Sequence, residues 1–120
     1  MKPIMYCYAR CGTCQKAKKW LKEESIEVTE IAIDQTPPSK EELTEWIKQS
    51  ELPLKCFFNT SGKIYKDLNL KEKLKTMDEK EQIELLSQHG MLIKRPLVIT
   101  NSGILVGFKE EEWKRTLLEE

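Results

Sequence analysis

Apolar residues recur with two different spacings along this chain, and the spacings predict strands in some segments and helices in others. Residues 2–8 form a short, mostly apolar run, and residues 27–33 are rich in β-branched side chains; both patterns are typical of strands. Between them, over residues 13–24, apolar side chains recur on one helical face while lysines occupy the others. A strand, a helix and a strand at this spacing predict a right-handed βαβ unit with parallel strands.

The remainder of the chain predicts a run of helices followed by a hairpin and a last helix. Ser39 and Glu42 have the spacing of a capping box, which opens a helix that ends before Pro53. The later elements are expected as a helix, a helix, two strands and a helix at residues 64–74, 76–90 (opened by a capping box of Thr76 and Glu79), 97–100, 104–106 and 108–118. The order βαβ, helices, ββα predicts an α/β protein with a thioredoxin-like sheet, in one domain over 1–120 with a helical insertion at about 39–90.

Charge and hydropathy narrow the range of partners. Lys and Arg number 20 and Asp and Glu number 20, so the formal net charge is zero, which argues against bulk electrostatic binding to nucleic acid or to an anionic membrane. No apolar run approaches the roughly 20 residues of a membrane-spanning helix, and the first residues lack the apolar core of a signal peptide. We therefore expect a soluble, cytoplasmic protein with no direct nucleic-acid or membrane partner.

Cysteine placement supplies the candidate chemistry. Three of the four cysteines fall within eight positions, and Cys11-Gly-Thr-Cys14 stands where the first strand gives way to the first helix. Cys11 is expected just before the helix, where unpaired N–H groups favour a thiolate and where Arg10 and Lys16 could add positive potential. Cys14 shares the apolar helical face and is expected to be buried. Cys11 is therefore predicted to attack an oxidised sulfur, and Cys14 to resolve the mixed disulfide.

Metal binding and simple packing are the alternatives at this cluster. Cys7, Cys11 and Cys14 have the spacing of the iron–sulfur ligands in radical S-adenosylmethionine enzymes, but those enzymes need a barrel much larger than this chain. A structural zinc would recruit Cys56 as a fourth ligand. However, Cys7 lies within a predicted strand, where packing in the core is expected of its side chain. The remaining alternative is a purely structural role, in which the two cysteines only pack in the apolar surroundings of the start of the helix. We predict redox chemistry with no bound metal or other cofactor.

Arg95-Pro96 is the second candidate site. A proline that enters a strand occupies the place of the cis-proline that thioredoxin-like folds set beside their C-x-x-C motif. A guanidinium at this place could hold a thiolate or an oxyanion. The alternative is an ordinary surface arginine that happens to precede a strand.

Three segments together resemble the ArsC/Spx family, the arsenate reductase-like branch of the thioredoxin-like proteins. They are MYCYARCGTCQKAKKWL near the start, FNTSGKIYKDLNLKEKL in the middle, and IKRPLVI followed by LVGF, so the resemblance covers nearly the whole chain. It implies a four-stranded mixed sheet, an inserted helical region, and a site built on Cys11 with Arg95 beside cis-Pro96. We assign substrate positioning to Gly12, Thr13 and Pro96.

Departures from the family pattern bear on its different functions. Glutaredoxin-coupled arsenate reductases surround arsenate with three arginines, of which only Arg95 is matched here. The other two positions correspond to Gly107 and to the vicinity of Phe57, and Arg115 lies in the last predicted helix. Each missing charge-assisted hydrogen bond is worth roughly 1.5–3 kcal/mol, which argues against arsenate reduction.

The resemblance leaves two function classes. The first is a thiol–disulfide oxidoreductase with Cys11 as nucleophile, Cys14 as resolving thiol and Arg95 as thiolate stabiliser; glutathione as co-substrate, or a glutaredoxin or thioredoxin partner, would restore the dithiol. The second is an Spx-like regulator, in which the C-x-x-C pair is a redox switch and the partner is the α subunit of RNA polymerase.

Overall fold

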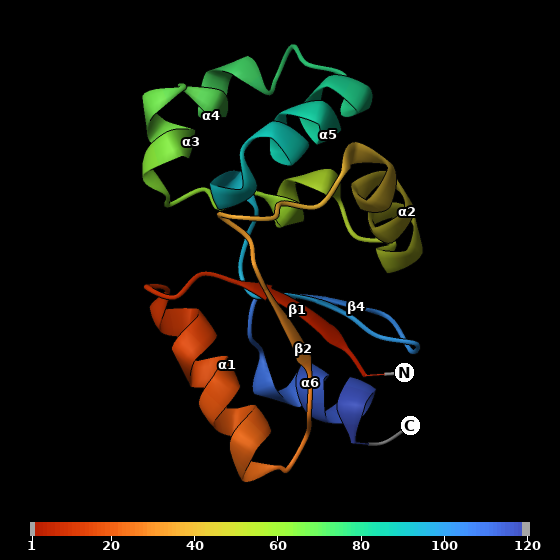
Figure 1. Cartoon of the computed structure of the whole chain (residues 1–120). Helices are drawn as coiled ribbons and strands as arrows, with labels where there is room; N and C mark the ends of the chain where they lie inside the picture. The colour runs from red at the N-terminus through yellow and green to blue at the C-terminus, as the bar shows by residue number, and fades with distance from the viewer. Residues whose placement is uncertain (1, 119–120) are drawn as a thin grey trace. The chain divides into compact units, whose positions relative to one another are not determined.

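Four short strands form one sheet in the structure, a computed structural model that describes residues 2–118 (Figure 1). In spatial order the strands are β2 (Thr29–Ala32), β1 (Ile4–Cys7), β3 (Leu97–Ile99) and β4 (Ile104–Val106). β1 runs parallel to β2 and antiparallel to β3, which is antiparallel to β4. The predicted mixed sheet, βαβ followed by ββα, is confirmed.

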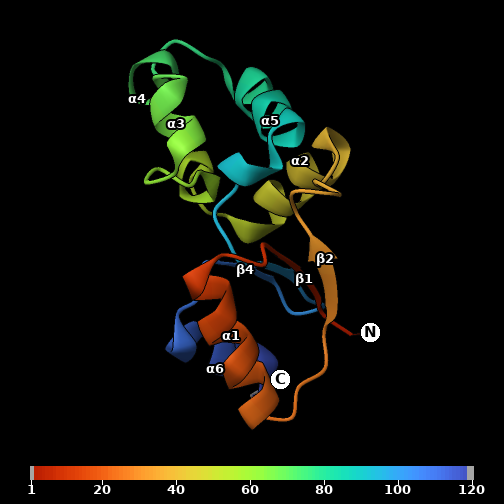
Figure 2. The ribbon, with the colours of Figure 1, turned by 60° about the vertical axis from the view of Figure 1, so that its left-hand side comes forward.

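Helices α1 (Gly12–Glu23) and α6 (Glu110–Leu117) lie on the same side of this sheet, as both ribbon views show (Figures 1 and 2). The sheet meets them with Met5, Val98 and Leu105, which are cross-strand neighbours on β1, β3 and β4. The helices contribute a set of fully or almost fully buried side chains to the same core: Cys14, Ala17, Trp20, Leu21 and Trp113. Burial of this face places the first turn of α1 against the end of β1, where the C-x-x-C motif lies.

The chain divides into two units. Of the described residues, 2–32 and 95–118 make up the first unit, which holds the sheet, α1 and α6. Ile33–Lys94 make up the second unit. The elements of the second unit are all helical: α2 (Lys40–Ser50), η1 (Leu54–Phe57), α3 (Lys63–Asp67), α4 (Leu70–Lys73), α5 (Glu79–Gln88) and η2 (Gly90–Leu92). Within it α2 and α5 pack together, and it spans the predicted helical insertion. No described helix has the length and hydropathy needed to cross a membrane.

Capping chemistry explains one correct and one wrong prediction in the second unit. The capping box of Ser39 and Glu42 is present at the start of α2. The box predicted for Thr76 and Glu79 is wrong, because the Asp78 carboxylate accepts the Glu81 N–H at 2.8 Å and caps α5 instead. Thr76 turns back and donates its hydroxyl to a carbonyl of the preceding turn. An ionised carboxylate is a strong N-cap, so the helix begins after it.

Several predicted boundaries also shift. The single helix expected over residues 64–74 is broken into α3 and α4, because Asn69 adopts a left-handed conformation with φ of 54°. The first three strands are shorter than expected, whereas β4 has its expected bounds. β3 ends at Ile99, because the Thr100 hydroxyl donates to the Gly103 carbonyl at 2.9 Å and closes the hairpin turn. Helix α5 stops at Gln88, before the predicted end at Gly90.

Candidate active site

The backbone around Cys11 holds this residue at the N-terminus of α1. Cys11 is the N-cap, one residue before the helix begins at Gly12. Its N–H donates to the Tyr8 carbonyl at 3.0 Å, and its carbonyl accepts the Gln15 N–H at 3.1 Å. The Gln15 side-chain amide donates to the Ala9 carbonyl at 2.8 Å, which ties the turn to the helix. The turn between β1 and α1 therefore points the Cys11 thiol at the free N–H groups of the first helical turn.

The Cys11 thiol is only partly buried and ionises more readily than an ordinary cysteine. Burial alone would raise its pKa, but hydrogen bonds from the Cys14 N–H and the Cys14 thiol, together with a hydrogen bond and the positive charge of Arg95, outweigh that effect. The net result is a pKa below the usual value for cysteine. The predicted preference for the thiolate at this position is thus supported by identified donors.

Cys14 is shifted in the opposite direction. Its side chain is fully buried, and burial is the largest cause of a pKa raised to about 12. The neighbouring Cys11, through its hydrogen bond and its charge, and Cys7, through its charge, raise it further. The two thiols of this motif therefore differ strongly in acidity: Cys11 ionises the more readily, and Cys14 is held in its protonated form.

Arg95 lies beside this pair and is held by an aromatic ring. Its guanidinium carbon is 5.6 Å from the centre of the Tyr8 ring, a cation–π distance. The Arg95–Pro96 peptide is cis, as expected, and Pro96 is buried. Arg10 and Lys16, which the sequence also suggested as cations, are both exposed, whereas Arg95 acts on Cys11 by charge and by hydrogen bond.

Gly107, the residue that follows β4, is bonded to Pro96 through its backbone. Gly107 donates its N–H to the Pro96 carbonyl at 2.9 Å, and its carbonyl accepts the indole N–H of Trp113 at 3.1 Å. Gly107 has φ of 77°, which favours glycine over every L-residue. An arginine here would be strained, and Arg115 is exposed on α6. Phe57, near the other family position, is a fully buried apolar residue.

Gly12 and Thr13 are exposed at the start of α1, and their substrate-positioning role stays a prediction. A Cβ built on Gly12 would meet no atom within 4 Å. Steric crowding within the described residues therefore does not require glycine at position 12.

Sequence reasoning missed two neighbours of the dithiol. Tyr8, which stacks on Arg95, gave no signal beyond its position just before the motif. Lys18 lies one turn after Cys14 and hydrogen-bonds Cys7, which is buried in the core as predicted. Among residues 2–118, no group of three or more His, Cys, Asp or Glu side chains is arranged to hold a metal ion.

The sheet is of the thioredoxin-like type, with a C-x-x-C motif before its first helix and a cis-proline beside that motif. These features define the class of the protein as thioredoxin-like. The chain belongs to the ArsC family, whose model matches residues 6–116. It is 55% identical to the uncharacterized protein YusI of Bacillus subtilis, over 95% of this chain and 97% of that protein. It is 28% identical to the global transcriptional regulator Spx 2 of Bacillus anthracis, over 95% of this chain and 86% of that one.

Solved structures show the same relationship. An ArsC family related protein from Bacteroides fragilis matches with a TM-score of 0.93 and 55% identity, covering 97% of this chain and 98% of that one. A possible arsenate reductase from Streptococcus mutans matches with a TM-score of 0.85 and 37% identity, covering 93% and 97%. The family therefore includes relatives named as regulators and relatives named as reductases.

Proposed function

We propose that this protein is a cytoplasmic thiol–disulfide oxidoreductase that uses Cys11 and Cys14. The observation that carries the proposal is the opposite displacement of the two thiol pKa values, downward at Cys11 and upward to about 12 at Cys14. A pair that served only as core packing would have no reason to place one thiol at a helix N-terminus beside a guanidinium. Such an environment is typical of reactive cysteines.

The reaction begins with the Cys11 thiolate. It attacks one sulfur of a disulfide or of a glutathionylated cysteine, forms a mixed disulfide, and expels the other sulfur as a thiolate. Cys11 then carries no negative charge, so a cause of the high pKa of Cys14 is removed. Cys14 loses its proton, attacks the Cys11 sulfur, and releases the second thiolate of the substrate. The substrate gains two electrons, and the protein is left with a Cys11–Cys14 disulfide.

Arg95 has two uses in this sequence of steps. It stabilises the attacking thiolate, and it offers a guanidinium to an anionic group of the substrate near Cys11. Glutathione, a glutaredoxin or a thioredoxin would return the disulfide to the dithiol, by exchange in the reverse sense. The cytoplasm, where thiols are kept reduced, supplies these partners.

Two variants test this proposal. Cys11→Ser should abolish turnover of a glutathionylated peptide, because no attacking sulfur remains. Cys14→Ser should let the first step proceed and accumulate the mixed disulfide, which is visible as an added glutathione mass. Cys56→Ser, at a partly buried cysteine of the second unit, is the control and should keep full activity. If both motif variants turn over substrate like the unmodified chain, the proposal is wrong.

A second function, a redox-switched regulator, is favoured by the relatives named Spx. In this alternative the Cys11–Cys14 disulfide changes the affinity of the protein for the RNA polymerase α subunit. Capture of purified α subunit by the oxidised and the reduced protein separates the two functions. Redox-dependent capture with negligible turnover supports the regulator, and turnover without capture supports the oxidoreductase.

Arsenate reduction is a third activity, suggested by the reductases among the solved relatives. Gly107, strained for any other residue, stands where an arsenate-binding arginine is expected, and Arg95 is the remaining match. We expect no arsenate-dependent thiol consumption. A substantial rate in that assay, lost in Arg95→Met, would restore arsenate as a substrate.

A further inference from the structure

A third thiol touches the pair, and the mechanism above leaves it unused. Cys7 is the last residue of β1, is 5% exposed, and belongs to the same core cluster as Cys14. The Cys14 thiol is close enough to Cys7 and to Cys11 to affect the pKa of each, and Cys11 packs against the core cluster that holds the other two. Cys14 therefore lies between two sulfurs, one exposed enough to meet a substrate and one closed off in the core.

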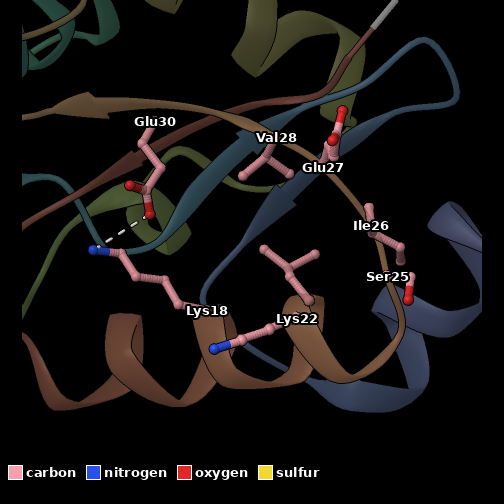
Figure 3. Close-up of a pocket in the computed structure, with 8 residues that line it drawn as sticks. Lys18, Lys22, Ser25, Ile26, Glu27, Val28 and Glu30 are labelled. Carbon is pink, nitrogen blue, oxygen red and sulfur yellow. Dashed lines mark ion pairs between the residues drawn. The ribbon is translucent and has the colours of Figure 1, made fainter.

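The surroundings of Cys7 are unusual for a core cysteine, because a lysine is directed at it. Lys18, on the second turn of α1, hydrogen-bonds Cys7, and its charge lowers the Cys7 pKa against the larger upward effect of burial. The Lys18 ammonium is also 3.3 Å from the Glu30 carboxylate on β2. Both residues line a surface pocket of about 540 Å³ between α1 and β2, where Figure 3 shows their ion pair. Burial and the Glu30 charge keep the Cys7 pKa above its usual value, and the partly exposed Lys18 ammonium is the cation that opposes them and favours the Cys7 thiolate.

From this arrangement we propose that Cys14 passes its disulfide bond from Cys11 to Cys7. The proposal rests on the oxidoreductase function, since it begins with the Cys11–Cys14 disulfide. The Cys7 thiol gives its proton to water, and its sulfur attacks the Cys14 sulfur. A Cys7–Cys14 bond forms, the Cys14–Cys11 bond breaks, and Cys11 leaves as a thiolate. One disulfide is exchanged for another, so no further oxidant or reductant is consumed.

Two features favour this direction of exchange. The leaving sulfur is Cys11, whose thiolate is stabilised by the helix N-terminus and by Arg95, and the more acidic thiol leaves faster. The new disulfide joins two buried cysteines, where an external thiol reaches it less easily than at the exposed end of α1. After the transfer the disulfide bond lies in the core, between Cys7 and Cys14. Cys11 is again a free thiolate that can attack a second disulfide.

Trypsin separates the two disulfides cleanly, because Arg10 lies between Cys7 and Cys11. A Cys11–Cys14 bond closes a loop within the single peptide 11–16. A Cys7–Cys14 bond joins that peptide to the one ending at Arg10, and leaves Cys11 open to alkylation. The experiment uses full-length Cys56→Ser protein, oxidised with one equivalent of glutathione disulfide. Free thiols are blocked with excess N-ethylmaleimide at mildly acidic pH, and the protein is then digested under non-reducing conditions and analysed by mass spectrometry.

The expected product is the disulfide-joined pair of peptides in which Cys11 is alkylated. Its amount should increase with time while the amount of the looped peptide decreases. Cys7→Ala and Cys7→Ser should lose the joined peptides and keep the loop. Lys18→Met should slow the transfer by about tenfold, the effect of one lost charge-assisted hydrogen bond, while Lys19→Met, at an exposed lysine of the same helix, should not. Thermal melting of each variant shows that it is folded.

Cys11→Ser separates the transfer from the proposed function. Oxidised with diamide, this variant should form the Cys7–Cys14 bond directly. If the looped peptide forms and turnover requires Cys11, but no joined peptides appear in either protein, the transfer is wrong and the oxidoreductase stands. If no disulfide of Cys14 forms in any protein, both proposals are wrong.

Discussion

Replacement of Arg95 by methionine removes the one cation identified as acting on the Cys11 thiol, and the result should be a less reactive cysteine. Arg95 lowers the Cys11 pKa by a hydrogen bond and by charge, so its loss raises that pKa. A hydrogen bond to a charged group contributes about 1.5–3 kcal/mol, and the partial exposure of both side chains argues for the lower end. Since about 1.4 kcal/mol is a factor of ten, the thiolate population below the pKa should fall about tenfold.

The assay is the rate of alkylation by iodoacetamide as a function of pH, in a Cys56→Ser background. The rate follows the thiolate, so its midpoint reports the Cys11 pKa, while Cys14, with a pKa of about 12, contributes little near neutral pH. Arg95→Met should move the midpoint upward and slow the reaction about tenfold on its acid side. Arg95→Lys should fall between the two, because it keeps the charge but loses the planar fork of donors.

Arg115→Met is the matched control, an exposed arginine on α6 that should leave the profile unchanged. An unchanged midpoint in Arg95→Met would refute the reasoning, since the remaining donors from Cys14 would then account for the low pKa by themselves. An equal shift in the Arg115 variant would refute it too, because the effect would then be one of overall charge.

Three further predictions concern the scaffold, and urea unfolding followed by circular dichroism measures each. Asp78→Ala should lower the free energy of unfolding by about 1 kcal/mol, the usual contribution of an N-cap, and Thr76→Ala should lower it by less than about 0.5 kcal/mol. A larger loss in the Thr76 variant would mean that Thr76, and not Asp78, is the N-cap. Gly107→Ala should cost about 1–2 kcal/mol because of its positive φ, whereas Gly12→Ala, with open space around it, should cost nothing; equal effects would contradict this. Trp113→Phe should cost about 1–3 kcal/mol, since the buried Gly107 carbonyl loses its donor, and a neutral result would mean that it finds another.

The local pattern of residues was enough to predict the order of the elements, the burial of Cys14 and the position of Cys11 before the helix. A face of apolar residues every three or four positions makes α1 a helix whichever residues it meets later, and Cys14 on that face had to be buried. Cys11, one residue outside the helix, had to meet its unpaired N–H groups. These features depend on neighbours in sequence, and the sequence therefore predicts them.

Boundaries were less predictable where two residues compete for the same role. Thr76 and Asp78 both stand three residues before a glutamate, and only the folded turn shows which one caps α5. Asn69 is a different case: its left-handed backbone conformation interrupts a pattern that reads as one continuous helix.

The identity of the groups around the thiols was decided by tertiary structure alone. Pairing of β1 with β3 brings Arg95 beside a cysteine that is distant in sequence, and Tyr8 holds it there by a contact that no local spacing encodes. The same is true of Cys7: its burial follows from the strand pattern, but its contact with Cys14 and Lys18 depends on how α1 packs on the sheet. Acidity is set by the charges and donors within a few ångströms, and only the packed chain determines which residues those are.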